Sequence, residues 1–582
     1  MNVMQKLLTE HIDIWTPAET EKKSGRGRVA GNAGRVYGIK KLRELILELA
    51  VRGKLVPQDA NDEPASELLK RIQAEKARLI AEGKIKKDKP LPPITGQEKP
   101  FELPQGWEWI RIGQIGHDWG QKTPDSDFTY IEVSAIDNQR GVVSLPELVK
   151  PENAASRARK VVKKGTVIYS TIRPYLLNIA VIEKDFVPEP IASTAFAIVH
   201  PFCSMPPRYL LCFLRSPVFV RYVESVQMGI AYPAINDSQF FSGLIPLPPI
   251  EEQQRIVSKV DELMTLCDQL ETRHSNAADA HEKLVSHLLG TLTQSQNAAD
   301  FSANWQRIAA HFDALFTTEA SIDALKQTLL QLAVMGKLVP QDANDEPASE
   351  LLKRIQAGKA KLIAEGKIKK GKSLLLIAEE EKPFELPNGW EWTTLALSSL
   401  VNPRNRVENN VSASFVTMTM IGTSFNSSHE QEARLWIDIK QGFTHFAEGD
   451  IGVAKITPCF ENSKACVFSE LLSGIGAGTT ELHIVRPINA TLEPRYVLAY
   501  LKSPQFLLVG ETKMTGTAGQ KRLPKEFVES NPFPLPPLSE QYRIVAKVDE
   551  LMALCDQLKS RITDSRQLQQ KLADVLVDQA EA

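Results

Sequence analysis

The sequence predicts an α+β protein with two mixed α/β domains in a pseudo-twofold arrangement, joined by long antiparallel coiled-coil helices. Three observations lead to this prediction. One long polar stretch occurs twice almost unchanged, one apolar seam of helical spacing occurs twice, and the regions between the copies share only traces of similarity. At 582 residues the chain also exceeds what one hydrophobic core organises, so several domains are expected.

The polar repeat shows that the chain is a tandem duplication. Residues 53–87 match residues 336–370 at all but two positions, and the match continues through a GWEW motif in each half. The two differences are Glu75/Gly358 and Arg78/Lys361. The centres, 110–245 and 393–533, have diverged. Because identical surfaces bind identical partners, this pattern predicts two copies of one partner and two different ligands. Recent duplication with little drift also explains the identity of the flanks.

The second repeated feature is an apolar seam that begins within PLPPIEEQQRIVSKVDEL (246–263) and PLPPLSEQYRIVAKVDEL (534–551). Its residues recur at spacings of four and three, which is typical of a coiled-coil helix. We predict that each seam packs antiparallel against the other and that its cysteine is structural. The seam residues are Ile256, Val260, Leu263, Cys267 and Leu270, and Ile544, Val548, Leu551, Cys555 and Leu558.

These features predict six regions along the chain. They are a basic flexible N-terminal arm (1–40), a first helical copy (41–98), a first variable domain (99–250), a central helical region with a spacer helix and the second copy (251–381), a second variable domain (382–538), and a distal helix (539–582). Between Lys22 and Arg43 the chain carries eight basic residues and no acidic residue. This run is either a solvated tail or an arm that touches phosphate.

Composition is that of a soluble globular protein, with 43% hydrophobic and 24% charged residues and a net charge of −2. No apolar run is long enough to span a membrane, and the first residues lack a signal-peptide pattern. Six cysteines without a CxxC pair argue against a disulfide framework and a zinc site. We therefore expect a cytoplasmic protein without a metal site or a membrane partner.

Motifs for catalysis are weak. GKIKKGKS (366–373) fits a phosphate-binding loop through Gly371, Lys372 and Ser373, but such a loop follows a buried strand and here an amphipathic helical stretch precedes it. GIGAGTT (474–480) is better explained as a turn before the strand ELHIV. No metal-ligand cluster or nucleophile–base constellation is evident. The chain therefore reads as a binding protein, with a P-loop ATPase as the enzymatic alternative.

The duplicated architecture resembles the specificity subunit of type I restriction–modification systems. The resemblance rests on the twofold repeat, on LRELILELAVRGKLVPQ and LKQTLLQLAVMGKLVPQ, on GWEW before each variable region, and on LPPLSEQYRIVAKVDEL at the start of the distal helix. It covers nearly the whole chain. The near-identical copies at the N-terminus and the centre resemble the type IB branch.

The resemblance implies a function without catalysis. Residues 99–250 and 382–538 would be target-recognition domains, each reading one half of a bipartite, asymmetric site in double-stranded DNA. The repeated helices would set the spacing and dock two methyltransferase subunits, which use S-adenosylmethionine. Two restriction/translocase subunits would add ATP- and Mg²⁺-dependent cleavage. The chain itself would hold no cofactor.

Base reading needs exposed donors and acceptors, with Arg or Lys for guanine and Asn or Gln for adenine. For any single candidate the alternative is an ordinary surface turn. The candidates are Arg140, Arg173, Tyr175, Tyr232, Asn236 and Gln239 in the first variable region, and Arg404, Arg406, Lys455, Gln520, Lys521 and Arg522 in the second. The GWEW tryptophans Trp107, Trp109, Trp390 and Trp392 lie outside the variable regions, so we expect core or subunit contacts rather than base stacking.

Neither variable region is basic overall. Residues 107–245 hold 14 basic and 13 acidic residues, and residues 390–533 hold 13 and 14. Because phosphate contacts supply much of the affinity for DNA, we predict weak DNA binding by this chain alone. The second alternative is a DNA-binding scaffold or repressor that works without partners. Such a protein needs a higher affinity for DNA than these charges provide.

Overall fold

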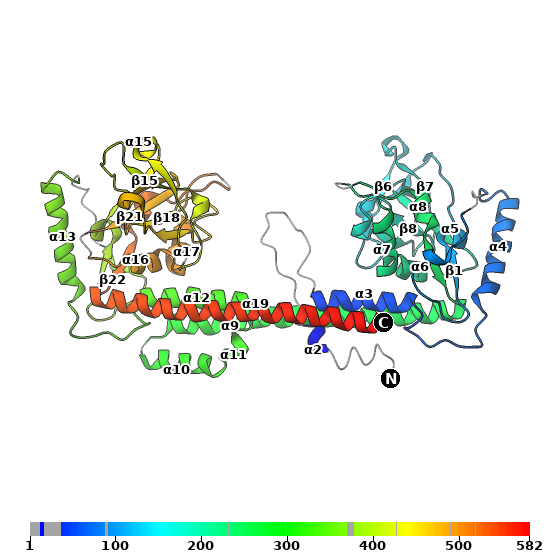
Figure 1. Ribbon diagram of the computed structural model, residues 1–582, viewed down its shortest axis with the longest axis horizontal. Helices are drawn as coiled ribbons and strands as arrows, with labels where there is room; N and C mark the ends of the chain where they lie inside the picture. Colours follow the sequence, from blue (N-terminus) through cyan, green and yellow to red (C-terminus); the bar gives the residue numbers. More distant parts are fainter. Residues whose placement is uncertain are drawn as a thin grey trace. The chain divides into compact units, whose positions relative to one another are not determined.

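The protein folds into two compact units (Figure 1). The computed structural model describes residues 12–16, 36–87, 91–229, 232–296, 298–368, 377–426, 428–488, 491–517 and 519–581. Unit 1 comprises Met1–Ala277 with Ser565–Ala582, and unit 2 comprises Ala278–Asp564. Each unit combines long helices with a sheet-containing domain, as the α+β class requires. The unit boundaries fall inside two long helices, α9 (Ile250–Gln294) and α19 (Leu538–Glu581).

Unit 1 holds two main sheets. A four-stranded sheet has the order β6-β3-β10-β7, and a six-stranded sheet has the order β2-β11-β8-β9-β5-β4. Strands β3 and β10 run parallel. The strands are β2 (Gly116–His117), β3 (Phe128–Ile131), β4 (Ile136–Asp137), β5 (Val142–Val143), β6 (Glu147–Val149), β7 (Ala158–Val161), β8 (Val167–Ser170), β9 (Ile179–Val181), β10 (Pro190–Ser193) and β11 (Phe196–Pro201). The helices that follow them are α6 (Pro207–Arg215), α7 (Pro217–Val226) and α8 (Asp237–Ser242).

Unit 2 repeats this plan. Its two main sheets have the orders β16-β15-β20-β17 and β14-β21-β18-β19, and β15 and β20 run parallel as β3 and β10 do. The strands are β14 (Ser399–Val401), β15 (Ser412–Val416), β16 (Glu432–Leu435), β17 (Thr444–Ala447), β18 (Ile451–Ala454), β19 (Ala465–Val467), β20 (Ile475–Gly478) and β21 (Leu482–Pro487). The helices that follow are α16 (Pro494–Leu501), α17 (Pro504–Lys513) and α18 (Lys525–Ser530). The diverged centres therefore keep one fold.

A strand pair closes the ends of each variable domain. In unit 1 the GWEW strand β1 (Glu108–Arg111) pairs antiparallel with β12 (Leu244–Leu247). In unit 2, β13 (Glu391–Thr394) pairs with β22 (Pro532–Leu535) in the same register. The chain therefore enters and leaves each variable domain at one place, on residues that belong to the repeated flanks.

The repeated polar stretch forms a clasp around this strand pair. In unit 1, Trp107 Nε1 donates to Glu252 Oε2 at 2.9 Å, and Gln58 Nε2 donates to the other carboxylate oxygen at 3.2 Å. Arg255 pairs with Asp62 beside them. Gly53 adopts a φ of 71° against Trp107, where an added Cβ would lie 3.1 Å from the indole. The unit 2 counterparts of these residues are Gly336, Gln341, Asp345, Trp390, Glu540 and Arg543.

This clasp explains part of the sequence identity. Trp107 and Trp390 are buried, which confirms the prediction of a core role. Two helices of the repeat extend from the clasp, α4 (Ala65–Ala81) and α13 (Ala348–Ala364). Each buries the apolar residues of one side only. The inward side chains of the repeat thus have an intramolecular reason to stay the same.

The predicted seams are buried, but they do not pack against each other. Ile256, Val260, Leu263 and Cys267 lie in the core of unit 1 with helix α3 (Tyr37–Val51) and with Ala573 and Val577 from the end of α19. Arg43 on α3 forms ion pairs with Asp268 and Glu271 on α9. The seam-to-seam pairing was therefore wrong, because the repeated helix of the same unit covers each seam.

Unit 2 has the matching arrangement. Ile544, Val548 and Cys555 share a core with helix α12 (Glu319–Val334) and with Val285, Leu289 and Leu292 from the end of α9. Leu551 and Leu558 are half-buried, as Leu270 is in unit 1, and Met552 takes the deeper position beside Leu551. In each unit the start of one long helix packs with the end of the other, so the pair is antiparallel. Burial raises the pKa of Cys267 to about 11, which fits its predicted structural role.

The N-terminal region is partly helical. Helix α2 (Ile12–Trp15) places Trp15 fully inside the core of unit 1, against Gly38 of α3. Lys40, Lys41 and Arg43 therefore lie on α3 rather than in an arm. The basic residues from Lys22 to Arg35 lie outside the described residues. None of the helices in the described parts of the chain combines the length and the apolar character that a membrane span needs.

Candidate nucleic-acid interface

Two exposed loops of unit 1 lie side by side and hold several predicted reading residues. Arg173 N donates to Pro233 O at 2.8 Å, and Ile235 N donates to Thr171 O at 2.9 Å. Within the second loop, Met228 and Ala234 exchange two backbone hydrogen bonds of 2.9 Å. We call residues 171–178, 227–229 and 232–236 the loop pair of unit 1.

A third turn adjoins this loop pair. Asn138 Nδ2 donates to Leu176 O at 2.9 Å, and the turn that holds Asn138 also holds Arg140. Arg215 at the end of α6 braces the turn, because its guanidinium donates to the carbonyl oxygens of Asn138 and Gln139. Three chain segments that are far apart in sequence therefore form one surface.

Unit 2 builds the same backbone arrangement from residues 455–463, 514–517 and 519–523, the loop pair of unit 2. Thr457 N donates to Lys521 O at 3.0 Å, and Leu523 N donates to Lys455 O at 2.7 Å. Thr515 and Arg522 exchange two backbone hydrogen bonds of 3.0 and 2.7 Å. Lys502, which directly follows α16, the helix that corresponds to α6, donates to the carbonyl oxygens of Thr423 and Ser463.

The hydrogen bonds define which positions correspond, and the side chains at those positions differ. The corresponding pairs are Thr171/Lys455, Arg173/Thr457, Met228/Thr515, Tyr232/Gln520, Pro233/Lys521 and Ala234/Arg522. Near its start, the second loop of each unit has a glycine with a positive φ, which is 89° at Gly229 and 130° at Gly516. An added Cβ there would lie 2.9 Å from Tyr232 O or 2.7 Å from Gln520 O, so the close approach requires glycine. One scaffold thus presents two different surfaces.

Four predicted residues of unit 1 are exposed on this surface. Arg173 has a φ of 50°, a left-handed conformation that is uncommon outside glycine, and its guanidinium lies 5.2 Å from the ring centre of Tyr232. Tyr232 is 70% exposed and Tyr175 is 55% exposed. Arg140 is exposed in the adjoining turn.

Asn236 and Gln239 have a structural role instead. Asn236 Oδ1 accepts from Gln239 N, and Gln239 Oε1 accepts from Asn236 N, both at 2.9 Å. These bonds form a capping box at the start of α8. The Gln239 amide also donates to Val226 O at 2.6 Å. The polar atoms that suggested adenine reading are therefore largely committed to the backbone.

The predicted reading residues of unit 2 differ in exposure and in whether they pair with other residues of the chain. Gln520 and Lys521 are exposed, and Lys455 is half-exposed beside them. Arg522 forms a bidentate pair with Glu481 at 2.9 and 3.0 Å. Hydrogen bonds from Arg522 lower the pKa of Glu481. Arg522 is thus neutralised within the chain, which weakens the prediction of guanine reading at this position.

Arg404 and Arg406 lie on a separate loop. Arg404 Nη1 donates to Phe443 O at 3.2 Å and contacts His445, whereas Arg406 is exposed. His483 links this loop to the loop pair of unit 2. Its ring nitrogens contact Asn402 Nδ2 at 3.3 Å and Leu523 O at 2.9 Å.

Sequence reasoning missed the apolar residues of this surface. Ile172, Leu176 and Met228 are 49%, 41% and 59% exposed on the loop pair of unit 1. They lie inside or beside the segments TIRPY and GIAYPAIN that hold the predicted polar residues. A search restricted to hydrogen-bonding side chains passes over them.

The enzymatic alternatives gain no support from the described residues. GIGAGTT forms strand β20 over Ile475–Gly478 and ends in the predicted turn at Thr480, directly before β21. Its Gly478 packs so closely that an added Cβ would lie 2.1 Å from Val416 O. Gly371, Lys372 and Ser373 lie outside the described residues, and the element before them is helix α13 rather than a strand. Within the described parts of the chain, no three His, Cys, Asp or Glu side chains are grouped so that they could hold a metal ion.

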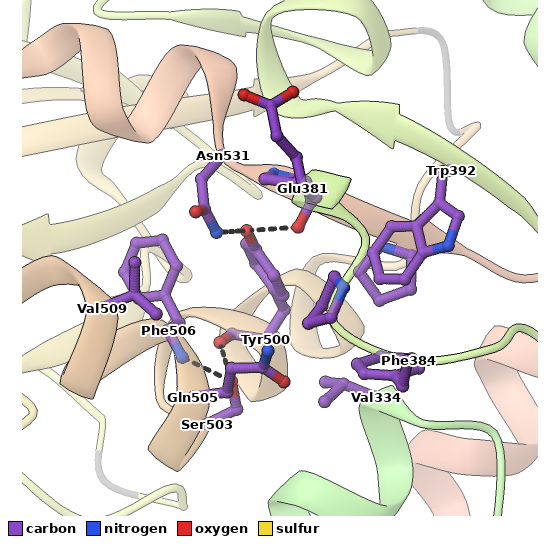
Figure 2. A pocket seen from close by; sticks show the side chains of 13 residues that line it. Val334, Glu381, Phe384, Trp392, Tyr500, Ser503, Gln505, Phe506, Val509 and Asn531 are labelled. Carbon is purple, nitrogen blue, oxygen red and sulfur yellow. Dashed lines mark hydrogen bonds between the residues drawn. The ribbon is translucent and has the colours of Figure 1, made fainter. Parts of the chain in front are cut away.

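A cavity of about 120 Å³ lies in unit 2, and its lining includes no residue of the loop pair (Figure 2). Its lining includes the aromatic side chains of Phe384, Trp392 and Phe506. The Asn531 amide donates to the Tyr500 hydroxyl at 2.6 Å. The Ser503 hydroxyl is held by a carbonyl oxygen and caps α17. The polar groups of this cavity thus serve the fold.

The structure is a duplicated chain whose two units carry equivalent loop pairs with unlike exposed side chains. Comparisons with known proteins show its family. Residues 104–279 match the model of the type I restriction modification DNA specificity domain. The chain is 41% identical to the EcoAI specificity subunit of Escherichia coli and 40% identical to the EcoEI specificity subunit of the same species, in each case over 99% of both chains.

The chain therefore belongs to the family of type I restriction enzyme specificity subunits. It is the specificity component of such an enzyme and not a catalytic one. A chain from a solved structure of complex assembly in the type I R-M system has a TM-score of 0.48 with 23% identity, covering 83% of this chain and 99% of that chain.

Proposed function

We propose that each unit reads one half of a bipartite, asymmetric DNA site through its loop pair. The observation that carries this proposal is the shared backbone of the two loop pairs with unlike exposed side chains. A shared scaffold offers the same approach to a DNA groove, and different side chains select different base edges. Exposed Arg140, Arg173, Gln520 and Lys521 supply hydrogen-bonding groups, while Asn236, Gln239 and Arg522 support the loops.

The repeated flanks dock two methyltransferase subunits. Apart from Arg78/Lys361, helices α4 and α13 expose the same side chains on the side that does not pack against the chain. These exposed pairs are Lys70/Lys353, Arg71/Arg354, Gln73/Gln356 and Ala74/Ala357. The clasp accounts for the inward residues of the repeat but not for these. Equal surfaces in both units are what two copies of one partner require.

The partners supply the chemistry of the complex. The methyltransferase subunits use S-adenosylmethionine, and two restriction/translocase subunits use ATP and Mg²⁺. The complex acts on DNA in the cytoplasm. Full-length similarity to the EcoAI and EcoEI subunits, against 46% coverage for the EcoDI subunit of Escherichia coli, supports a branch with two near-identical copies, which the sequence assigns to type IB.

A methylation map tests the proposal. The chain is co-expressed with its cognate methyltransferase subunit in a host that lacks adenine methylation, and the genome is sequenced for N6-methyladenine. One recurring motif of two unlike halves around a fixed gap is expected. Replacing residues 110–245 by the corresponding region of a relative should change one half alone, because the Glu108/Leu247 and Trp109/Pro246 pairs of β1 and β12 stay in place at the junction. Replacing 393–533 should change the other half.

The outcome separates the proposal from the scaffold alternative. If the partner is soluble and bound but no methylation appears, specificity for methylation is refuted and a partner-free DNA scaffold is favoured. If either replacement changes both halves, the assignment of one half-site to each unit is refuted.

A further inference from the structure

The loop pair of unit 1 carries an apolar face that faces solvent. Ile172 and Met228 both pair with Ala234 in isolated antiparallel bridges. Residues paired across antiparallel strands point to the same side, so the side chains of Ile172 and Met228 flank that of Ala234. They are 49% and 59% exposed, and Tyr232 beside them is 70% exposed. We call Ile172, Met228, Tyr232 and Ala234 the apolar face of unit 1.

Three of the four corresponding positions of unit 2 are polar, and the fourth is Ile456, which is half-buried. The same bridges join Ile456 and Thr515 to Arg522, and Gln520 stands where unit 1 has Tyr232. Arg522 carries its ion pair with Glu481. One backbone thus presents a methionine, an alanine and a tyrosine in one unit, and a threonine, an arginine and a glutamine in the other.

This difference argues against a shared protein partner at the face. The flanks are nearly identical, so each unit offers the same docking surface to one kind of partner. A surface that is apolar in one unit and charged in the other cannot complement the same partner twice. Clustered apolar side chains on a surface nevertheless indicate binding. The ligand must therefore differ between the units, as two DNA half-sites do.

Only one group on the base edges of the major groove is apolar. It is the C5-methyl group of thymine, and aliphatic side chains recognise it by contact. From this chemistry we infer that the apolar face of unit 1 recognises thymine methyl groups in the half-site that unit 1 reads. The inference rests on the proposed function. Arg173, held against the ring of Tyr232, provides a cation beside the apolar side chains for a phosphate or a guanine.

Deoxyuridine provides the test, because it lacks only the methyl group of thymine. The purified complex of this chain with its methyltransferase partner is titrated with duplexes that carry the mapped motif. Thymines of the unit 1 half-site are replaced by deoxyuridine in one duplex and those of the unit 2 half-site in another. We expect affinity to fall about fourfold for each recognised methyl group that the first duplex lacks. The second duplex should bind within about twofold of the unmodified DNA.

A substitution in the apolar face of unit 1 tests whether that face causes the loss of affinity for deoxyuridine. Met228→Ala should reduce the ratio of affinities for thymine and deoxyuridine duplexes toward one, because the side chain that touches the methyl group is gone. Thr515→Ala, at the corresponding position of unit 2, should leave the ratio unchanged. Both residues are exposed, so neither substitution disturbs a core.

Three results would overturn the inference in different ways. Equal affinity for the thymine and deoxyuridine duplexes, with the bipartite motif intact, refutes methyl recognition and leaves the proposed function standing. Loss of the methyltransferase subunit from the Met228→Ala complex identifies the face as a protein contact. Failure to find a bipartite motif in the methylation map refutes the proposed function and the inference together.

Discussion

The indole Nε1 of Trp107 donates a 2.9 Å hydrogen bond to the buried carboxylate of Glu252 in the first turn of α9. Trp390 and Glu540 repeat this bond at the same distance. The hydrogen bond joins the GWEW strand, which begins a variable domain, to the long helix that follows that domain. This hydrogen bond therefore attaches each variable domain to the repeated part of the chain.

Trp107→Phe should destabilise unit 1 by about 1–3 kcal/mol, because it removes the donor to Oε2 of the buried Glu252 carboxylate and leaves only the Gln58 amide on Oε1. Burial raises the pKa of Glu252 while the bond from Trp107 lowers it, so losing the donor also favours protonation. Trp109→Phe is the matched control, since the Trp109 Nε1 is buried without a hydrogen-bond partner. Denaturant unfolding of both variants checks this. Equal losses of stability in Trp107→Phe and Trp109→Phe would show that the smaller ring, and not the lost hydrogen bond, causes the destabilisation.

Unit 1 should lose stability in mild acid through His200. Burial lowers the pKa of His200 from 6.5 to about 4, with the charges of His117 and Lys163 adding to the effect and Glu75 opposing it. Between these values the unfolded chain binds a proton that the folded chain does not. The contribution of His200 is therefore complete above pH 6.5 and is lost as the pH falls toward 4.

Melting temperatures measured between pH 7 and pH 4 check this prediction. His200→Gln, which cannot titrate, should show a shallower decline than the parent chain. The corresponding residue of unit 2 is Arg486, paired with Asp450 at 2.7 Å, so His200 is a feature of unit 1. An identical decline in both proteins would assign the acid sensitivity to other groups.

Asn236 should act as a helix cap and not as a base reader. Asn236→Ala is expected to lower stability by about 1 kcal/mol through loss of the cap, whereas Asn236→Ser keeps a capping oxygen and most of that stability. The methylation motif should be unchanged with Ser. A changed motif in a stable Asn236→Ser protein would restore the reading role of this residue.

The isolated chain should bind DNA weakly. Both variable regions are close to neutral, and in unit 2 the exposed Arg522 is already paired with Glu481. Because affinity and its salt dependence follow the number of phosphate contacts, the complex with the methyltransferase should show a tighter constant and a steeper salt slope than the chain alone. Titrations of one duplex between about 50 and 200 mM salt measure both. Tight specific binding by the chain alone would favour the scaffold alternative.

Local sequence pattern was sufficient to predict the long helices and the two repeated units of this protein. Spacings of three and four identified both long helices, and the tandem repeat identified two equivalent units, because periodicity and self-similarity are properties of neighbouring residues. The burial of Cys267 and Cys555 followed from their place in the seams. The family also followed from the arrangement of repeats and variable centres.

Tertiary structure alone decided the partners of these elements. Whether Ile256 faces the other seam or helix α3 depends on packing across hundreds of residues, which no local spacing encodes. The same holds for the surface. Asn236 caps a helix, Arg522 pairs with Glu481, and Ile172 and Met228 flank Ala234. Backbone hydrogen bonds between distant loops determine which side chains remain free to meet a ligand.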